Sequence, residues 1–418
     1  MINSSSSNVP PPPPLQQQPL VVNNTSTNTT NNNNNTFINN FISNINGNEL
    51  NSIKSKLKKP TNQHVVDFKE RYEQALRNEQ DEKSKLFNRK FIYCNNNNSW
   101  IRIENNLNNL NNNENIIKNI YNEMIEFPKE LKIITLNTWF ANILQDQRYT
   151  EQLNVFKNLN VDIICLQEVI PLYVIDFITK NDFIKNNYII SDIDGNSIDP
   201  YGVMILIKKN LPILDIKINK LTTRMGRCLI NCTFAKNIPN LDIYLKYLNS
   251  INNNDINSNI EELEKLIPTY AIIGTVHLES LSSKERRHVQ LNEIYSIYNQ
   301  YPNTEIKMLM GDFNFDSSSI ENDQLLTGNY KDYKDIWYYL YPNIEGKTFL
   351  YQNNRKGQRL DRILLNSKNY IPKEIKIIGN EKLILNEQDQ LKLKQSFSLD
   401  YTCMSDHFGL YSEIYNIE

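Results

Sequence analysis

An aspartate and an asparagine stand two residues apart, directly after an apolar run. The run covers residues 306–310, and Gly311, Asp312, Phe313 and Asn314 follow it. Side chains alternate across a strand, so Asp312 and Asn314 leave it on the same side, and Gly311 lets another backbone come close. Oxygen ligands of this kind suit a hard cation and a phosphate. Taken alone, the same residues also fit a strand that ends in a polar turn.

Two more apolar runs end in a similar way. Asn137 follows residues 132–136, and Gln167 and Glu168 follow residues 163–166. Asn137 offers a neutral amide ligand. A carboxylate such as Glu168, beside a buried strand, is costly to keep ionised without a cation. The alternative to a metal ligand is that Glu168 is a carboxylate at the edge of a sheet whose hydrogen bonds are all made within the protein.

Two of the four histidines stand at the same kind of place. His277 follows residues 270–276, and His407 precedes residues 409–414. Asp361 is a further buried carboxylate that could orient an imidazole, as in hydrolytic sites that pair a base with an orienting group. An isolated histidine is more often structural than catalytic, but two that recur in this strand-end series favour catalysis.

These residues need a sheet that brings the strand ends together. From Pro128 onward, apolar strands alternate with helices and turns, and we expect residues 128–418 to form one large α/β domain. An Asn-rich stretch, residues 236–265, is expected to be a surface insertion, with one helix at 260–266. The strands are expected at residues 132–136, 162–166, 202–207, 227–234, 270–276, 306–310, 362–365, 375–378 and 409–414.

The chain before this domain has a different composition. Residues 1–64 are runs of Asn, Ser, Thr, Gln and Pro with almost nothing to bury, so we expect them to be disordered. Residues 65–127 are expected to form an accessory region. It contains an amphipathic helical stripe at residues 65–76 and a short hairpin made of residues 91–94 and 100–103.

The composition argues against several classes of protein. A net charge of −2 provides no global basic field for indiscriminate nucleic-acid binding, so phosphate contacts must come from local groups. Five cysteines without a C-x-x-C pair argue against a zinc module or a disulfide framework. They favour a reducing compartment, with most of the thiols buried. No apolar stretch approaches the length of a membrane span, and the residues after Met1 do not have the pattern of a secretory signal peptide. We therefore expect neither a membrane-spanning segment nor secretion by that route. The candidate basic patches are Lys208 with Lys209; Arg224 with Arg227; Lys284 with Arg286 and Arg287; and Arg355, Lys356, Arg359 and Arg362.

Six short motifs occur in order across residues 131–418. They are L-N-T-W from Leu136, L-Q-E-V from Leu166, H-L-E-S from His277, G-D-F-N from Gly311, L-D-R-I from Leu360 and S-D-H-F-G-L from Ser405. The ordered set resembles the endonuclease/exonuclease/phosphatase superfamily. The resemblance implies a DNase I-like four-layer sandwich, in which two packed mixed β-sheets are flanked by helices. Within the superfamily, the spacing is most similar to that of the tyrosyl-DNA phosphodiesterase 2 group.

The resemblance implies a metal site and a water site. Glu168 would be the main ligand of Mg²⁺, with Mn²⁺ as an alternative metal, and Asn137 and Asp406 would assist it. Asp312 and Asn314 would position or deprotonate the attacking water.

The resemblance also implies how the substrate is held. His407, oriented by Asp361, would stabilise the phosphate in the transition state, and His277 would contact a phosphate oxygen. Phe349 stands where the group often has a tryptophan, which keeps an aromatic face for base stacking. The residues implied to bind substrate are Tyr201, Arg287, Phe349, Arg359 and Ser405.

The implied activity is hydrolysis of the 5′-phosphotyrosyl bond between a DNA end and a trapped topoisomerase. This is a DNA-repair role, with DNA carrying a 5′ tyrosyl adduct as partner and the nucleus, or also the cytoplasm, as location. The lysines between residues 54 and 59 fit a nuclear-import signal or a chance basic run. An abasic-site endonuclease, a deadenylase or a sphingomyelinase would share the metal ligands. A non-catalytic nucleic-acid-binding scaffold is the alternative of another class, although such a relative would be expected to have lost at least one of Glu168, Asp312, Asn314 and His407.

Overall fold

The computed structural model describes residues 90–94, 98–103, 125–238, 267–349 and 356–418. The expected disordered tail, the amphipathic stripe at residues 65–76 and the helix at 260–266 lie outside these ranges. So does most of the expected insertion.

The first of the two large sheets has eight strands. It is antiparallel except where β4 and β5 run parallel. In spatial order its strands are β15 (Tyr370–Ile378), β16 (Gly409–Asn416), β4 (Glu130–Asn137), β5 (Ile163–Val169), β7 (Gly202–Lys208), β6 (Tyr188–Ile190), β1 (Phe91–Cys94) and β2 (Ser99–Arg102).

The second large sheet has six strands, and its one parallel pair is β11 with β12. In spatial order its strands are β13 (Lys334–Asp335), β14 (Asp361–Ser367), β12 (Ile306–Asp312), β11 (Thr269–His277), β9 (Cys228–Ala235) and β8 (Ile213–Lys220). A small separate ladder joins β3 (Ile125–Glu126) to β10 (Asn237–Ile238).

The nine strands expected in residues 128–418 are all present, with ends shifted by a few residues. The expected hairpin is present as β1 and β2, and β1 also pairs with β6. The first sheet therefore extends into residues expected to be an accessory region.

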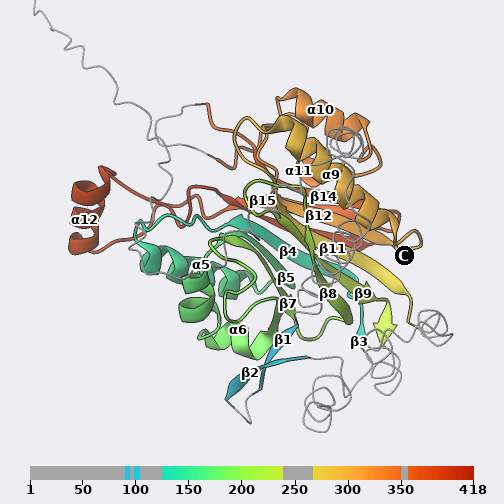
Figure 1. The fold of residues 1–418 in the computed structure, drawn as a ribbon, viewed down its shortest axis with the longest axis horizontal. Coiled ribbons are helices and arrows are strands. Elements are labelled where there is room, and N and C mark those ends of the chain that lie inside the picture. Colours follow the sequence, from blue (N-terminus) through green and yellow to red (C-terminus); the bar gives the residue numbers. More distant parts are fainter. Residues whose placement is uncertain (1–89, 95–97, 104–124, 239–266, 350–355) are drawn as a thin grey trace, which may run out of the picture. The chain divides into compact units, whose positions relative to one another are not determined.

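The two sheets pack face to face with helices on both outer faces (Figure 1). Ile133 and Ile163 of the first sheet meet Ile273 and Met308 of the second in one buried cluster. The outer face of the first sheet is covered by α5 (Gln145–Leu159), the π-helical turn η2 (Tyr173–Ile178) and α6 (Asp182–Asn187). The outer face of the second is covered by α9 (Lys284–Asn299) and α10 (Ile320–Thr327). This is the four-layer sandwich expected from the sequence.

Two more helices complete the described chain. α11 (Ile336–Leu340) packs Ile336 and Trp337 into the cluster between the sheets, whereas Leu393 is the buried residue of α12 (Glu387–Phe397). No helix within the described ranges is long and apolar enough to cross a bilayer.

The parallel pairs of the two sheets lie against each other. β5 contacts β11 and β4 contacts β12 across the interface. Gln167 Nε2 of β5 donates to Thr275 Oγ1 of β11 at 2.9 Å, so a buried polar bridge joins the sheets just below their strand ends. All four strands consequently end near the same place.

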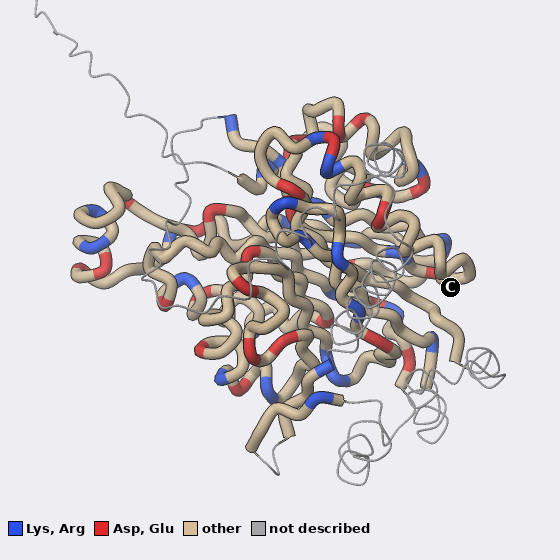
Figure 2. Tube along the Cα trace, in the orientation of Figure 1, with Lys and Arg blue, Asp and Glu red and all other residues tan. Residues whose placement is uncertain are grey.

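Lysines and arginines are interspersed with acidic residues over the described part of the chain (Figure 2). Several members of the expected basic patches are paired with carboxylates. Lys208 contacts Asp162 at 3.0 Å, and Arg286 contacts Glu279 at 3.4 Å.

Candidate active site

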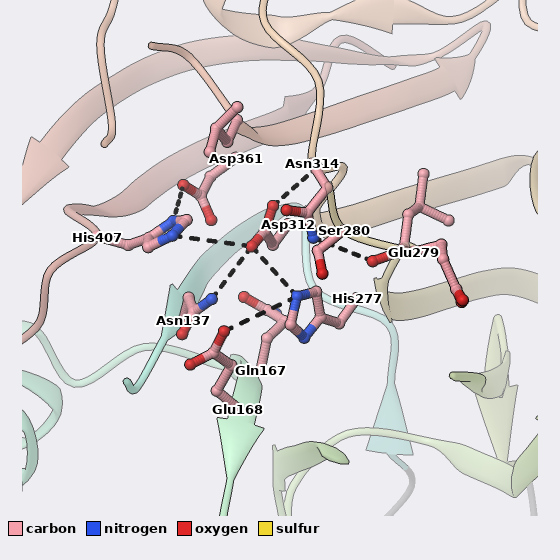
Figure 3. A network of polar contacts seen from close by, with 12 residues as sticks. Asn137, Gln167, Glu168, His277, Glu279, Ser280, Asp312, Asn314, Asp361 and His407 are labelled. Atoms are coloured by element: carbon pink, nitrogen blue, oxygen red, sulfur yellow. Dashed lines mark hydrogen bonds and ion pairs between the residues drawn. The ribbon is translucent and has the colours of Figure 1, made fainter. Parts of the chain in front are cut away.

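Asp312 is the centre of the polar cluster where the strands end. β12 ends at Asp312, β11 at His277 and β4 at Asn137, and these side chains point toward one another (Figure 3). Asp312 Oδ2 accepts a hydrogen bond from Asn137 Nδ2 at 3.1 Å and lies 3.4 Å from His277 Nε2. The same oxygen lies 3.9 Å from His407 Nε2. Asn314 donates its backbone N–H to Asp312 Oδ1 at 2.8 Å. One buried carboxylate thus faces groups from both sheets.

Gly311 is required by the contact between β11 and β12. It pairs with Val276, one residue before the pair formed by His277 and Asp312. Its φ is +140°, and a Cβ there would lie 1.9 Å from the Val276 carbonyl oxygen. Glycine avoids both the backbone strain and this collision. The close backbone approach expected at Gly311 is therefore confirmed.

Glu168 stands on a bulge in β5. The pairing of β5 with β7 shifts register between Leu166 and Val169, and Glu168 has a φ of +54°. Glu168 Oε1 lies 3.9 Å from His277 Nε2, and Oε2 accepts the Phe140 N–H at 3.3 Å. The side chain is 14% exposed, so it lines the open side of the cluster.

His277 is held in its neutral form. Its Nδ1 lies 3.0 Å from Arg227 Nη1. A guanidinium can only donate, so Nδ1 must accept and the ring proton is on Nε2, which faces Asp312. Burial, followed by the charge of Arg227, lowers the pKa of His277 to about 3. At neutral pH this side chain is an uncharged N–H donor.

His407 has the opposite character. Its Nδ1 lies 2.9 Å from Asp361 Oδ2. Burial disfavours the charged ring, but Asp361 and then Asp312 raise the pKa of His407 well above its ordinary value. At neutral pH His407 is therefore an imidazolium that donates to Asp361 and presents its other N–H toward Asp312. The carboxylate of Asp312 lies between one neutral and one cationic histidine.

The acidic residues of the cluster disfavour one another's charge. Burial, followed by the charge of Asp406, raises the pKa of Glu168 to about 7. Burial also raises the pKa of Asp406. A divalent cation relieves such a concentration of buried charge, and carboxylate oxygens are the ligands that Mg²⁺ prefers. Glu168 and Asp406 therefore fit a hard divalent cation.

A second group could also surround an ion. One ligand atom each from Asp312, Asp361 and His407 lie within 4.8 Å of one another. However, His407 Nδ1 already donates to Asp361, and a hard cation prefers oxygen to nitrogen. We therefore interpret this trio as a chain of hydrogen-bonding groups rather than as a metal site.

Two buried side chains of α5 hold the loop that follows Asn137. Arg148 donates to the carbonyl oxygens of Thr138 at 3.0 Å and Trp139 at 3.2 Å. Gln152, one helical turn later, donates to Thr138 at 3.2 Å and to the Met404 carbonyl oxygen at 2.7 Å. These contacts tie the end of β4 to the segment that carries Asp406 and His407.

Aromatic rings flank the cluster on two sides. Tyr201 stacks on Phe140, with ring centroids 4.8 Å apart and planes 19° apart. The guanidinium carbon of Arg227 lies 5.3 Å from the Tyr201 ring centre, and Tyr201 lies 6.4 Å from the ring of His277. Phe349 lies 4.8 Å from the ring of His407. Planar groups of a ligand would meet an aromatic surface on either side of Asp312.

The sequence model of the Endonuclease/Exonuclease/phosphatase family matches residues 134–407, which is more than half of the chain. The chain belongs to this family. The match includes Asn137, Glu168, His277, Asp312 and His407. No curated protein matches the chain.

Several solved structures are similar to this family member. A D. rerio TDP2 humanized by 14 mutations is 22% identical, with a TM-score of 0.50, and the match covers 69% of this chain and 100% of that one. D. rerio TDP2 complexed with single strand DNA product is 20% identical, with a TM-score of 0.49 and the same coverage. The human Nocturnin catalytic domain with bound sulfate is 14% identical, with a TM-score of 0.47, and the match covers 70% of this chain and 96% of that one.

Most residues expected to act together in this family member lie around Asp312. Tyr201 and Phe349, expected to bind substrate, lie beside the two histidines. Asn314 donates its Nδ2 to the Leu278 carbonyl oxygen at 3.0 Å, which leaves its Oδ1 as the acceptor. Asn137 Oδ1 accepts the Trp139 N–H at 3.0 Å.

Three residues expected to bind substrate have hydrogen-bond partners inside the protein. Arg287 is buried and donates to both carboxylate oxygens of Glu321, at 2.8 and 2.6 Å. Arg359 is buried and donates to both oxygens of Asp335, at 2.9 and 2.7 Å. The hydroxyl of buried Ser405 donates to the Asn137 carbonyl oxygen at 2.6 Å. In the structure the polar groups of these three residues hold the protein together, and their contact with substrate stays a prediction.

Sequence reasoning missed several residues of the site. The sequence places Arg227 only within a basic patch, and Phe140 directly follows the L-N-T-W motif without a role of its own. Arg148 and Gln152 were not named, although their spacing of four places them on one face of a helix. Their roles depend on which loop that face meets, which the sequence does not show.

Proposed function

We propose that this member of the family is a divalent-metal-dependent phosphodiesterase that hydrolyses the 5′-phosphotyrosyl bond at a DNA end. The observation that carries the proposal is that Asp312 lies 3.4 Å from His277 and 3.9 Å from His407, with Glu168 3.9 Å from His277. Phosphodiester hydrolysis needs charge neutralisation and an aligned water more than a covalent nucleophile. The cluster contains groups for both tasks.

Glu168, with Asp406 and Asn137, would hold the metal, which we propose to be Mg²⁺ with Mn²⁺ as an alternative. When bound, a divalent cation supplies Lewis-acid polarisation of a phosphate oxygen. The raised pKa of Glu168 supports this assignment, because a buried carboxylate near another acid is stabilised in its charged form by a cation.

The water and the phosphate would be handled by the remaining polar groups. Asp312 and Asn314 offer acceptor oxygens to an attacking water, which Asp312 can orient or deprotonate. Cationic His407 and the Nε2–H of His277 would donate to phosphate oxygens as charge develops on them. Asp361 keeps His407 charged and turned toward Asp312.

The aromatic surfaces support an aryl ester of DNA over the alternatives. Arg227 over Tyr201 makes a cationic aromatic surface beside His277, which suits a departing phenolate. Phe349 offers a ring for a nucleobase on the side of His407. A phenolate leaves without a dedicated general acid. D. rerio TDP2, one of the similar structures, was solved with a single strand DNA product. A repair role of this kind implies action in the nucleus on DNA ends that carry a tyrosyl adduct.

The test is a panel of substrates with and without Mg²⁺. It comprises a 5′-tyrosyl oligonucleotide, an abasic duplex, a poly(A) strand and sphingomyelin. We expect release of tyrosine with a 5′-phosphate left on the DNA, and loss of release with EDTA. Faster cleavage of any other substrate would overturn the assignment.

Two variants test the metal and water sites in the same assay. Glu168→Gln and Asp312→Asn should each lose at least about a hundredfold in rate, as losses of electrostatic groups in active sites do. Glu345→Gln, at a side chain that is 73% exposed, is the matched control and should keep the rate. Near-full activity of Glu168→Gln would remove the metal assignment, and near-full activity of Asp312→Asn would remove the water assignment.

A further inference from the structure

Thr348 lies between the two segments that carry Asp361 and His407. It is fully buried. Its Oγ1 accepts the backbone N–H groups of Leu360 and Asp361, both at 3.1 Å. Its carbonyl oxygen accepts the N–H of Phe408 at 2.6 Å. One residue therefore fixes the backbone beside both members of the carboxylate–imidazole pair.

These two segments belong to different sheets. Asp361 begins β14 of the six-stranded sheet, and His407 lies two residues before β16 of the eight-stranded sheet. The backbone of Phe349 continues the connection, since it forms isolated bridges with both Gln358 and His407. The 2.9 Å contact between Asp361 Oδ2 and His407 Nδ1 spans the gap between the sheets, so its length depends on what holds the two segments together.

The chemistry of the side chain matters at this position. Two N–H groups converge on one oxygen, and a hydroxyl oxygen has two lone pairs to receive them. Valine has the same shape but no acceptor, so both buried N–H groups would lose their partner. Serine keeps the oxygen and lacks only a methyl group.

We propose that Thr348 is a positioning residue: its hydroxyl holds the start of β14 so that Asp361 meets His407 and aims the imidazole ring at Asp312. Thr348 touches no reacting atom in this account. The inference rests on the proposed phosphodiesterase function, but it does not depend on whether the leaving group is tyrosine.

The experiment is a double-mutant cycle between Thr348 and His407. Thr348→Val, Thr348→Ser, His407→Ala and the double variant Thr348→Val with His407→Ala are assayed with Mg²⁺ on an aryl phosphodiester, thymidine 5′-(4-nitrophenyl) phosphate. Thr348→Val should lower kcat about 10- to 100-fold with KM little changed, as expected for a misplaced catalytic group. Thr348→Ser should stay within about threefold of wild type because the acceptor is retained.

The decisive comparison is made in the background that lacks His407. If Thr348 acts through His407, adding Thr348→Val to His407→Ala should cost less than about threefold, because coupled residues are not additive. An equal loss with and without His407 would show a merely structural role and overturn the proposal. If Thr348→Val does not fold, Thr348→Ala replaces it in the cycle, and failure of both to fold overturns the proposal too.

A second readout does not need activity and keeps this inference separate from the proposed function. The chain has only four histidines, so a ¹⁵N-histidine-labelled sample has few ring signals to assign. The Nδ1–H of His407, identified by its loss in His407→Ala, should shift or broaden in Thr348→Val and stay in place in Thr348→Ser. An unchanged signal in Thr348→Val overturns the inference about Thr348. A wild type that cleaves none of the panel substrates overturns the proposed function alone.

Discussion

Replacing Gly311 with alanine tests how closely β11 and β12 must approach. The new Cβ would lie 1.9 Å from the Val276 carbonyl oxygen, about 1.5 Å short of the 3.4 Å at which ordinary contact begins. The φ of +140° adds a strain of about 1–3 kcal/mol for any residue with a Cβ. The two strands must therefore move apart beside His277 and Asp312, whose facing atoms are now 3.4 Å apart.

We expect Gly311→Ala to lose both stability and activity. A displacement of about 1 Å of a catalytic group can cost about a hundredfold in rate, so hydrolysis of an aryl phosphodiester should fall by at least that factor. Gly226→Ala is the matched control, because Gly226 also has a positive φ, +72°, but a Cβ there would meet nothing within 4 Å. Thermal unfolding and kcat are measured for both variants. If Gly311→Ala matches Gly226→Ala in both, the close approach of the two strands is not what holds the site.

Two further perturbations have outcomes that the structure decides. Glu168 has a folded-state pKa raised from 4.5 to about 7, so in metal-free protein its stabilising effect is complete below pH 4.5 and lost as the pH rises through 7. In urea unfolding with EDTA, the free energy of unfolding of the wild type should fall relative to that of Glu168→Gln as the pH rises from 4.5 to 7. The fall should be at most about 1.4 kcal/mol per pH unit. A difference that stays constant over this range would contradict the raised pKa of Glu168. Arg359→Met should destabilise the fold by about 3 kcal/mol, because it leaves buried Asp335 with Arg362 as its remaining partner, and it should leave KM unchanged. A raised KM at unchanged stability would instead support the substrate role that the sequence predicts for Arg359.

The strands could be predicted because most of them are apolar on both faces. In β4, Ile133 packs between the sheets and Ile134 packs under the helices, so neither face shows polar residues. β8 was missed because charged residues alternate with its isoleucines, among them Asp215, which is nevertheless buried. A charged residue inside a buried strand is visible only once its neighbours in the fold are known.

The site was predictable to the extent that it lies at strand ends. Parallel strands bring their ends to one edge, so Asn137, His277 and Asp312 could be grouped from sequence order alone. The arginines could not be sorted in this way. Arg287 and Arg359 pair with Glu321 and Asp335, which lie 34 and 24 residues away along the chain. A basic residue near a motif has the same sequence signature whether it binds a phosphate or an internal carboxylate.

Glu168 shows where strand alternation fails and why that matters for the chemistry. Ile164 and Leu166 pack under the helices, so a regular strand would send residue 168 to the same outer face. Instead Val169 takes that place, because the bulge after Leu166 adds one residue to the strand. The side chain of Glu168 therefore points toward the opposite sheet, where its carboxylate lies 3.9 Å from His277 Nε2. The carboxylate of Glu168 reaches the other sheet through a single extra residue, which the hydrophobic pattern conceals and only the pairing with β7 reveals.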